Sequence, residues 1–209
     1  MKIPLEFGFY AILTNPVRGY EYCAKVFVDH EIAFVQLRMK DAPEAEIIKV
    51  AEKMREITSG TKTKLIINDN PNIAKTVGAD GVHVGQNDMP FNEARTIVGE
   101  RAIVGMSTHS VHQMQDACRL KPDYVGVGPV YATPTKKKPD PVTGIDGMKE
   151  MLAQATVPAV AIGGITLENL PLVLEAGAKN FCMVRPITIT QEPEKVLREI
   201  LKVYRGFIS

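Results

Sequence analysis

The sequence alternates short apolar runs with segments of helical periodicity, and this alternation restricts the possible folds more than any other feature. Eight runs have the length and the β-branched or aromatic content of strands, and they span residues 9–13, 33–37, 64–68, 81–84, 102–106, 124–128, 159–162 and 181–184. Strands that alternate with helices are usually parallel. Eight such units in 209 residues match the lower size limit of a (β/α)8 barrel, whereas an open doubly wound sheet usually has fewer strands. We therefore predict an α/β protein with a single TIM-barrel domain over residues 1–209.

The helical segments carry start and stop signals. Asp41, three residues before Glu44, and Ser110, three residues before Gln113, are each spelled like a capping box at a helix start. A helix that follows Thr166 is expected to stop at Gly177, because glycine adopts the left-handed C-terminal conformation at little cost. The last helix is predicted over residues 194–204.

Charge and cysteine content exclude several classes of function. The chain has 25 Lys and Arg against 24 Asp and Glu, so it lacks the general positive charge that nucleic-acid partners require. Cys23, Cys118 and Cys182 are far apart and form no Cys-x-x-Cys pair, which argues against a disulfide framework or a thiolate metal site. Neither a secretory leader nor a membrane span is apparent. We predict a cytoplasmic protein that binds neither nucleic acid nor membrane.

Polar clusters follow three of the predicted strands, at the point where each strand ends. They are 36–40, 68–69 and 86–88. Because the carboxyl ends of parallel strands lie on one side of a barrel, the three clusters are expected to converge on one site.

Two carboxylates, Asp69 and Asp88, follow the third and fourth strands. Magnesium takes one or two protein carboxylates and completes its octahedron with water and phosphate oxygens, so this pair suits Mg²⁺. A general-acid pair is the competing use, but the neighbouring Asn68 and Gln86 indicate a polar site rather than the apolar burial that such a pair needs. Taken singly, each aspartate has an ordinary alternative as a turn or helix cap.

Cationic side chains accompany the carboxylates. Arg38 and Lys40 alternate with Gln36 along a predicted strand, so all three should point into the barrel at its upper rim. Buried cations need anionic partners. A polyphosphate would provide these, although a salt bridge to an aspartate of a neighbouring strand would also do so. Ser107 and Lys136 add a hydroxyl and another cation after the fifth and sixth strands.

A long loop and a double glycine complete the predicted rim. The loop over 129–147 has the length of a lid or binding loop, and its functional residues should be Thr133, Thr135 and Lys136, which lie nearest the preceding strand. Gly163-Gly164 offers amides at the mouth of a helix, a frequent phosphate position in barrels. His83 and His109 lie near the same rim and are interpreted as structural residues.

These motifs together resemble those of the thiamine phosphate synthase family, over nearly the whole chain. The matching stretches are Gln36-x-Arg38-x-Lys40, Asn68-Asp69, Gly81-Val82-His83-Val84-Gly85-Gln86-x-Asp88, Gly105-x-Ser107-x-His109, Gly126-x-Gly128-Pro129-Val130-Tyr131-x-Thr133-x-Thr135-Lys136 and Ala161-Ile162-Gly163-Gly164-Ile165. The resemblance implies a (β/α)8 barrel and a transferase that joins a pyrimidine diphosphate to a thiazole phosphate.

The resemblance also implies a role for each matching residue. The diphosphate would be held by Arg38, Lys40, Asn68, Ser107 and Lys136, and Mg²⁺ by Asp69 and Asp88. Gln36 would contact the aminopyrimidine, and Thr133, Thr135 and Gly164 would face the thiazole phosphate. The chain departs from the family at Arg185-Pro186, where a small pair such as Ser-Ala is usual. Arg185 either binds the thiazole phosphate directly or closes the pocket to the usual acceptor.

Two alternatives stay open on the sequence alone. The related thiazole tautomerases are barrels that transfer protons, and His109 would be the residue to examine for that activity. A barrel that binds thiazole or pyrimidine phosphates without turnover is the non-enzymatic alternative. Arg185-Pro186 is the feature that keeps it open, whereas the intact cation and carboxylate sets argue against it.

Overall fold

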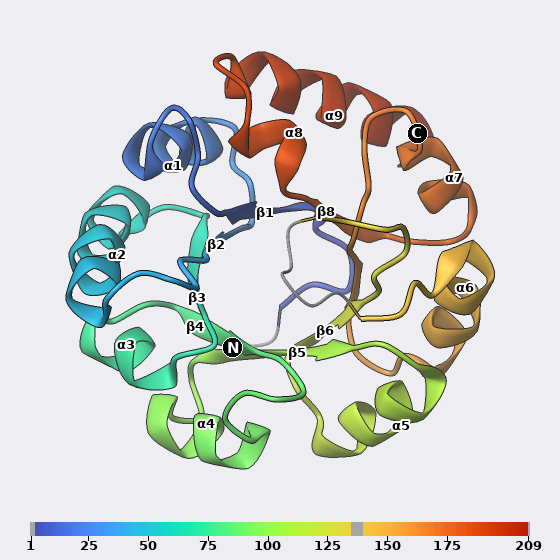
Figure 1. Cartoon of the computed structure of the whole chain (residues 1–209), viewed down its shortest axis with the longest axis horizontal. Helices are drawn as coiled ribbons and strands as arrows, with labels where there is room; N and C mark the ends of the chain where they lie inside the picture. The colour runs from blue at the N-terminus through green and yellow to red at the C-terminus, as the bar shows by residue number, and fades with distance from the viewer. Residues whose placement is uncertain (1–2, 135–139, 209) are drawn as a thin grey trace.

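The computed structural model describes residues 3–134 and 140–208. These residues form a closed barrel of eight parallel strands, in which each strand pairs with the next and the last pairs with the first (Figure 1). The strands are β1 (Gly8–Leu13), β2 (Phe34–Leu37), β3 (Lys64–Asn68), β4 (Gly81–Val84), β5 (Ile103–Thr108), β6 (Tyr124–Val127), β7 (Ala159–Ala161) and β8 (Asn180–Met183). The predicted (β/α)8 barrel is confirmed, and every predicted strand overlaps an observed one.

Helices form a ring around the barrel (Figure 1). They are α1 (Tyr20–Asp29), α2 (Glu44–Thr58), α3 (Pro71–Thr76), α4 (Phe91–Val98), α5 (Val111–Leu120), α6 (Gly144–Gln154), α7 (Leu170–Glu175), α8 (Arg185–Thr188) and α9 (Pro193–Ile208). The short helix α8 was not predicted. It begins with Arg185-Pro186 directly after β8 and packs against α9. The chain therefore turns at the carboxyl end of β8 before it reaches the last helix.

Of the three predicted helix boundaries at Asp41, Ser110 and Gly177, the structure confirms the last two. Ser110 is the N-cap of α5, and its side chain accepts a hydrogen bond from the backbone N–H of Gln113 at 3.2 Å. Gly177 follows α7 with a φ of 98°, as predicted for a glycine stop. The prediction for Asp41 was wrong, because the N-cap of α2 is Pro43 and no side chain caps that helix. Proline disfavours the helical conformation in the residue before it, so the helix cannot begin earlier.

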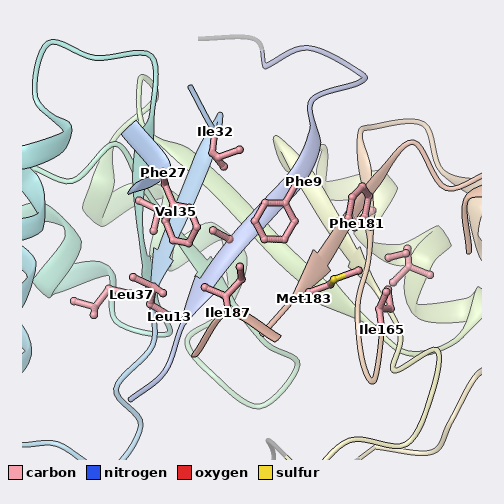
Figure 2. Close-up of a cluster of buried hydrophobic side chains, with 14 of the residues drawn as sticks. Phe9, Leu13, Phe27, Ile32, Val35, Leu37, Ile165, Phe181, Met183 and Ile187 are labelled. Carbon is pink, nitrogen blue, oxygen red and sulfur yellow. The ribbon is translucent and has the colours of Figure 1, made fainter. Parts of the chain in front are cut away.

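The apolar residues form two layers, one on each face of the strands. Phe9, Leu13 and Phe181 point outward and pack against the helices in the main core (Figure 2). Side chains alternate along a strand, so Tyr10 and Ile12 point into the barrel. The buried residues of this interior cluster are Tyr10, Ile12, Phe34, Ile66, Ile103, Tyr124, Val160 and Cys182.

The parallel arrangement places all carboxyl ends of the strands on one rim, where the predicted polar clusters lie. Among the described residues, every helix is too short or too polar to cross a lipid bilayer.

Candidate active site

Two adjoining hollows open at this rim. The inner cavity has a volume of about 430 Å³, and its lining includes Tyr10, Gln36, Asn68, Ser107, Gly164 and Arg185. The outer cleft has a volume of about 740 Å³, and its lining includes Asn15, Lys40, Glu46 and Asp88. Arg38, His109 and Asp140 line both hollows, so the two form one continuous cup.

An acidic pair and one lysine lie at the edge of this cup. The Nζ of Lys40 is 2.6 Å from Oδ2 of Asp69 and 4.0 Å from Oδ1 of Asp88. The two carboxyl groups are close enough to hydrogen-bond to each other. Burial and the Asp88 carboxyl raise the pKa of Asp69, although Lys40 opposes the shift. Burial alone would raise the pKa of Asp88, but hydrogen bonds with Asp69 and from the N–H of Gly85, at 2.8 Å, lower it.

Neither aspartate has the capping role that the sequence left open. Asn70, not Asp69, caps α3 with its side chain. Asp69 adopts a left-handed φ of 63° and donates its N–H to the carbonyl of His83 at 2.7 Å. The N-cap of α4 is Pro90, so Asp88 is not a helix cap either. A non-glycine residue at positive φ is uncommon and is often found at functional sites.

The donor set of the pair fits magnesium. In the described part of the chain, no group of three or more His, Cys, Asp or Glu residues could hold a metal ion. Structural or catalytic zinc requires at least three protein ligands, whereas magnesium takes one or two carboxylates and completes its shell with water and phosphate oxygens. Asp69 and Asp88 could therefore hold Mg²⁺ together with a phosphate ligand.

Arg38 and Lys40 lie just beyond β2, and this corrects one detail of the prediction. The strand ends at Leu37, so the two cations belong to the following loop rather than to the strand. Arg38 still lines the inner cavity and the outer cleft. Burial lowers its pKa, while nearby aspartates, Asp69 first, oppose the shift. Arginine keeps its charge in proteins, so Arg38 remains a cation in this site.

Three predicted polar residues meet in the inner cavity. Gln36 is only 2% exposed and donates its Nε2 hydrogen to the hydroxyl of Tyr10 at 3.0 Å. Asn68 ends β3, and Ser107 lies near the end of β5 with its Oγ 2.9 Å from Nε2 of His83. The barrel thus brings Gln36 and Ser107 into one cavity, although they are 71 residues apart in the sequence.

Thr133, Gly164 and Arg185 line the side of the inner cavity formed by the later strands. Gly164 has a φ of 62°, and a Cβ atom there would lie 2.6 Å from the carbonyl oxygen of Ala132, so a larger residue does not fit. The prediction that this glycine lies at the mouth of a helix was wrong, since α7 begins only at Leu170. Gly164 instead lets two loops approach closely.

Two residues predicted for the same loop, Thr135 and Lys136, lie outside the described residues. Their assignment stays a prediction.

The interior tyrosines are the site residues that the sequence reading missed. Tyr10 and Tyr124 line the inner cavity together with His83 and His109. The two histidines were interpreted as structural residues, with His109 also considered for the tautomerase alternative. The alternation of side chains along the first and sixth strands could have predicted the position of the tyrosines. It places both of them on the strand face that points into the barrel, away from the helices.

Fold and site together define the class. This is a (β/α)8-barrel protein with an enzyme-like cup at the carboxyl ends of its strands, equipped with cations and a carboxylate pair. The family model described as thiamine monophosphate synthase matches residues 12–187. The chain belongs to this family.

Known relatives agree with this assignment. The chain is 41% identical over 170 residues to a thiamine-phosphate synthase of Gloeobacter violaceus, covering 79% of this chain and 50% of that protein. The chain thus spans half the length of that relative. It is 37% identical over 183 residues to the thiamine-phosphate synthase of Caldicellulosiruptor bescii, covering 88% and 84%. The solved structure of thiamine phosphate pyrophosphorylase from Pyrococcus furiosus superposes with a TM-score of 0.87 at 25% identity, covering 97% of this chain and 98% of that one.

Proposed function

We propose that this chain is a thiamine-phosphate synthase, with residues 1–209 acting as one barrel domain. It joins 4-amino-5-hydroxymethyl-2-methylpyrimidine diphosphate to thiazole phosphate and releases thiamine phosphate and diphosphate. The single observation that carries this proposal is the placement of Lys40, Asp69 and Asp88 at the edge of a cup that Arg38 also lines. Family membership and relatives named for this activity support it.

The first chemical step breaks the bond between the pyrimidine methylene carbon and the diphosphate oxygen, and the bonding electrons leave with the diphosphate. The ring nitrogen of the thiazole then donates its lone pair to the methylene cation. No protein nucleophile is needed, so catalysis consists of positioning and of stabilising the developing negative charge.

The diphosphate is assigned to Arg38, Lys40, Asn68, Ser107 and Lys136. Arginine provides two parallel N–H donors, whereas lysine provides a compact charge. Asp69 and Asp88 would hold Mg²⁺, which supplies further positive charge to the departing diphosphate.

The two organic groups are assigned to the inner cavity. Gln36, which is buried in its wall, would contact the aminopyrimidine. Thr133, Thr135, Gly164 and Arg185 would bind the thiazole phosphate, and we assign Arg185 a direct contact with that phosphate because it lines the cavity beside Gly164. A cytoplasmic location stays a prediction, as does the expectation that nucleic acids are not partners.

The test is turnover. Purified protein with Mg²⁺ and both substrates should form thiamine phosphate and diphosphate in equal amounts, as measured by chromatography. Omission of the thiazole phosphate or chelation of the metal should stop product formation. Asp88→Asn should lose magnesium-dependent turnover, whereas Asp116→Asn, a surface control on α5, should retain it. A folded protein without product at high concentration would refute the proposal.

Thiazole tautomerisation is the second candidate, because His109 lies in the cavity wall. Its Nδ1 is 2.5 Å from the carbonyl oxygen of Gly128 and must donate to it, and its Nε2 lies 3.5 Å from Asp140. The same preparations should be supplied with the thiazole tautomer alone, and isomerisation without condensation would favour this activity. Binding of either phosphate by calorimetry without any turnover would favour the non-catalytic alternative.

A further inference from the structure

A row of hydrogen bonds crosses the barrel interior and connects two of the proposed substrate-binding residues. Gln36 donates to the hydroxyl of Tyr10 at 3.0 Å, and the hydroxyls of Tyr10 and Tyr124 are 2.7 Å apart. The hydroxyl of Tyr124 is 3.0 Å from Nδ1 of His83, and Nε2 of His83 is 2.9 Å from Oγ of Ser107. We call these five residues the interior relay.

The surrounding barrel is shaped to hold the relay. Gly105 leaves room for the ring of Tyr124, because a Cβ atom at that position would lie 2.2 Å from Cζ of the tyrosine. The Tyr124 ring stacks on His83 and meets Tyr10 edge to face. Burial raises the pKa of both tyrosines, so both hydroxyls keep their protons at neutral pH.

With the Nε2 of Gln36 donating to Tyr10, the hydrogen bonds of the relay are all satisfied in one direction only. Tyr10 accepts a hydrogen from Gln36, donates its own to Tyr124, and Tyr124 donates to Nδ1 of His83. The imidazole is then neutral, with its proton on Nε2, and donates to Ser107. The opposite direction would give Tyr10 two donors and leave its buried O–H without an acceptor among the described residues, which is unfavourable.

This direction determines what the two ends can offer to a substrate. Ser107 already accepts a hydrogen bond from His83, so its O–H can donate into the inner cavity. Gln36 donates an amide N–H to Tyr10, so its Oε1 can accept a hydrogen bond from an amino group of the substrate.

We propose that Tyr10, Tyr124 and His83 are positioning residues that keep Ser107 as a donor to the departing diphosphate and Gln36 as an acceptor for the aminopyrimidine. The proposal rests on the proposed function and deepens it. The proposed effect of the relay is to fix the proton positions at its two ends, Gln36 and Ser107, before the substrate binds.

The first test needs no turnover. Nitrogen-15 NMR of the histidine rings should report a neutral His83 with its proton on Nε2, assigned by comparison with His83→Gln. Tyr124→Phe should abolish the fixed tautomer and give a mixture of both forms. A proton on Nδ1, or a tautomer unchanged in Tyr124→Phe, would overturn the proposal. If the wild-type protein makes no thiamine phosphate, the proposed function fails while this result still decides the relay.

The second test separates the two ends kinetically. Tyr124→Phe and His83→Leu should lower kcat roughly tenfold, with little change in KM for the pyrimidine diphosphate. This is less than the roughly 100- to 1000-fold loss expected when a preorganised donor is removed outright, because Ser107 itself remains. Tyr10→Phe should mainly raise KM for the pyrimidine diphosphate. His83→Gln should recover most of kcat, because its amide can accept from Tyr124 and donate to Ser107.

The matched control is Tyr204→Phe on α9, which removes a hydroxyl outside the inner cavity and should leave both constants unchanged. Equal losses in His83→Gln and His83→Leu, at wild-type Tm, would indicate packing alone and refute the positioning role. If His83→Leu does not fold, Tyr124→Phe decides the kcat prediction, since it removes a single oxygen atom.

Discussion

The acidic pair gives a prediction in which two isosteric substitutions have opposite effects on stability and the same effect on activity. Asp69→Asn should stabilise the metal-free protein at pH 7, because burial and the neighbouring Asp88 raise the pKa of Asp69 and make its charge unfavourable. Asparagine also tolerates the left-handed φ of 63° at this position, so the backbone should not change.

The size of the effect follows from two opposing contributions. Relief of burial and of like-charge repulsion favours Asp69→Asn. Loss of the ion pair with Lys40 opposes it, but the lysine side chain is 44% exposed, and such pairs contribute at most about 1 kcal/mol. We expect a net gain of about 1 kcal/mol, or roughly 2–4 °C in Tm for a chain of this length.

Asp88→Asn is the matched substitution with the opposite sign. Hydrogen bonds with Asp69 and from Gly85 lower the pKa of Asp88, so its carboxylate stabilises the fold. A hydrogen bond to a charged group contributes about 1.5–3 kcal/mol. The asparagine oxygen can still accept a weaker bond from Gly85, so we expect a loss of roughly 1 kcal/mol. Both variants should lose magnesium-dependent turnover.

The dependence on pH provides a further check. Asp69 has a raised pKa in the folded state, so it is the protonated carboxyl that favours folding. This contribution is complete below the ordinary pKa of about 3.9 and is lost as the pH rises through the folded pKa. Asp88 has a lowered pKa, so its contribution is present above about 3.9 and is lost as the pH falls through the folded pKa. The gain in unfolding free energy from Asp69→Asn should therefore appear as the pH rises above about 3.9. The loss in unfolding free energy from Asp88→Asn should disappear as the pH falls below about 3.9.

Urea unfolding of metal-free wild type and both variants over a pH series would measure these differences, and magnesium titration calorimetry would measure the metal affinity. Stability changes of the same sign in both variants would refute the electrostatic argument. Unaltered magnesium affinity in both variants would refute the assignment of the metal to this pair.

Three other substitutions test the rest of the site and the barrel. Arg185→Ser should raise KM for the thiazole phosphate more than for the pyrimidine diphosphate, and steady-state kinetics showing equal effects would contradict its placement. Gly164→Ala puts a Cβ atom 2.6 Å from the carbonyl oxygen of Ala132 and should lower the free energy of unfolding by about 2–4 kcal/mol. Gly177→Ala is the control: its Cβ meets no atom within 4 Å, so it should lower the free energy of unfolding by only about 1–2 kcal/mol. Asn180→Ala removes four side-chain hydrogen bonds, three to Leu5, Phe7 and Gly8 around the start of β1 and one to Ala159 of β7. It should lower the free energy of unfolding by roughly 3 kcal/mol or more, and an unchanged urea midpoint would contradict the importance of these bonds.

The sequence predicted the barrel because its signals are local. Each strand is marked by a short β-branched run and each helix by a 3.6-residue period, and both depend only on neighbours along the chain. Convergence of Arg38, Ser107, Asp69 and Asp88 at one rim followed from a general property of parallel strands, so most of the site could be predicted before its geometry was known.

Features that depend on local backbone detail were harder to predict. The end of β2 at Leu37, the positive φ of Asp69 and the short helix α8 arise from contacts with other strands and loops. Side-chain patterns do not encode these features, because hydrogen bonds such as that from Asp69 to the carbonyl of His83 join distant parts of the chain.

Only the tertiary structure decided which interior side chains touch. The sequence by itself determined that Tyr10, His83 and Tyr124 occupy strands, and strand alternation assigns each of them a face. Whether their polar atoms meet depends on the stagger of the strands around the closed barrel and on the space that Gly105 leaves. Barrel closure is a property of all eight strands together, and for that reason the interior relay appears in the fold and not in any segment of the sequence.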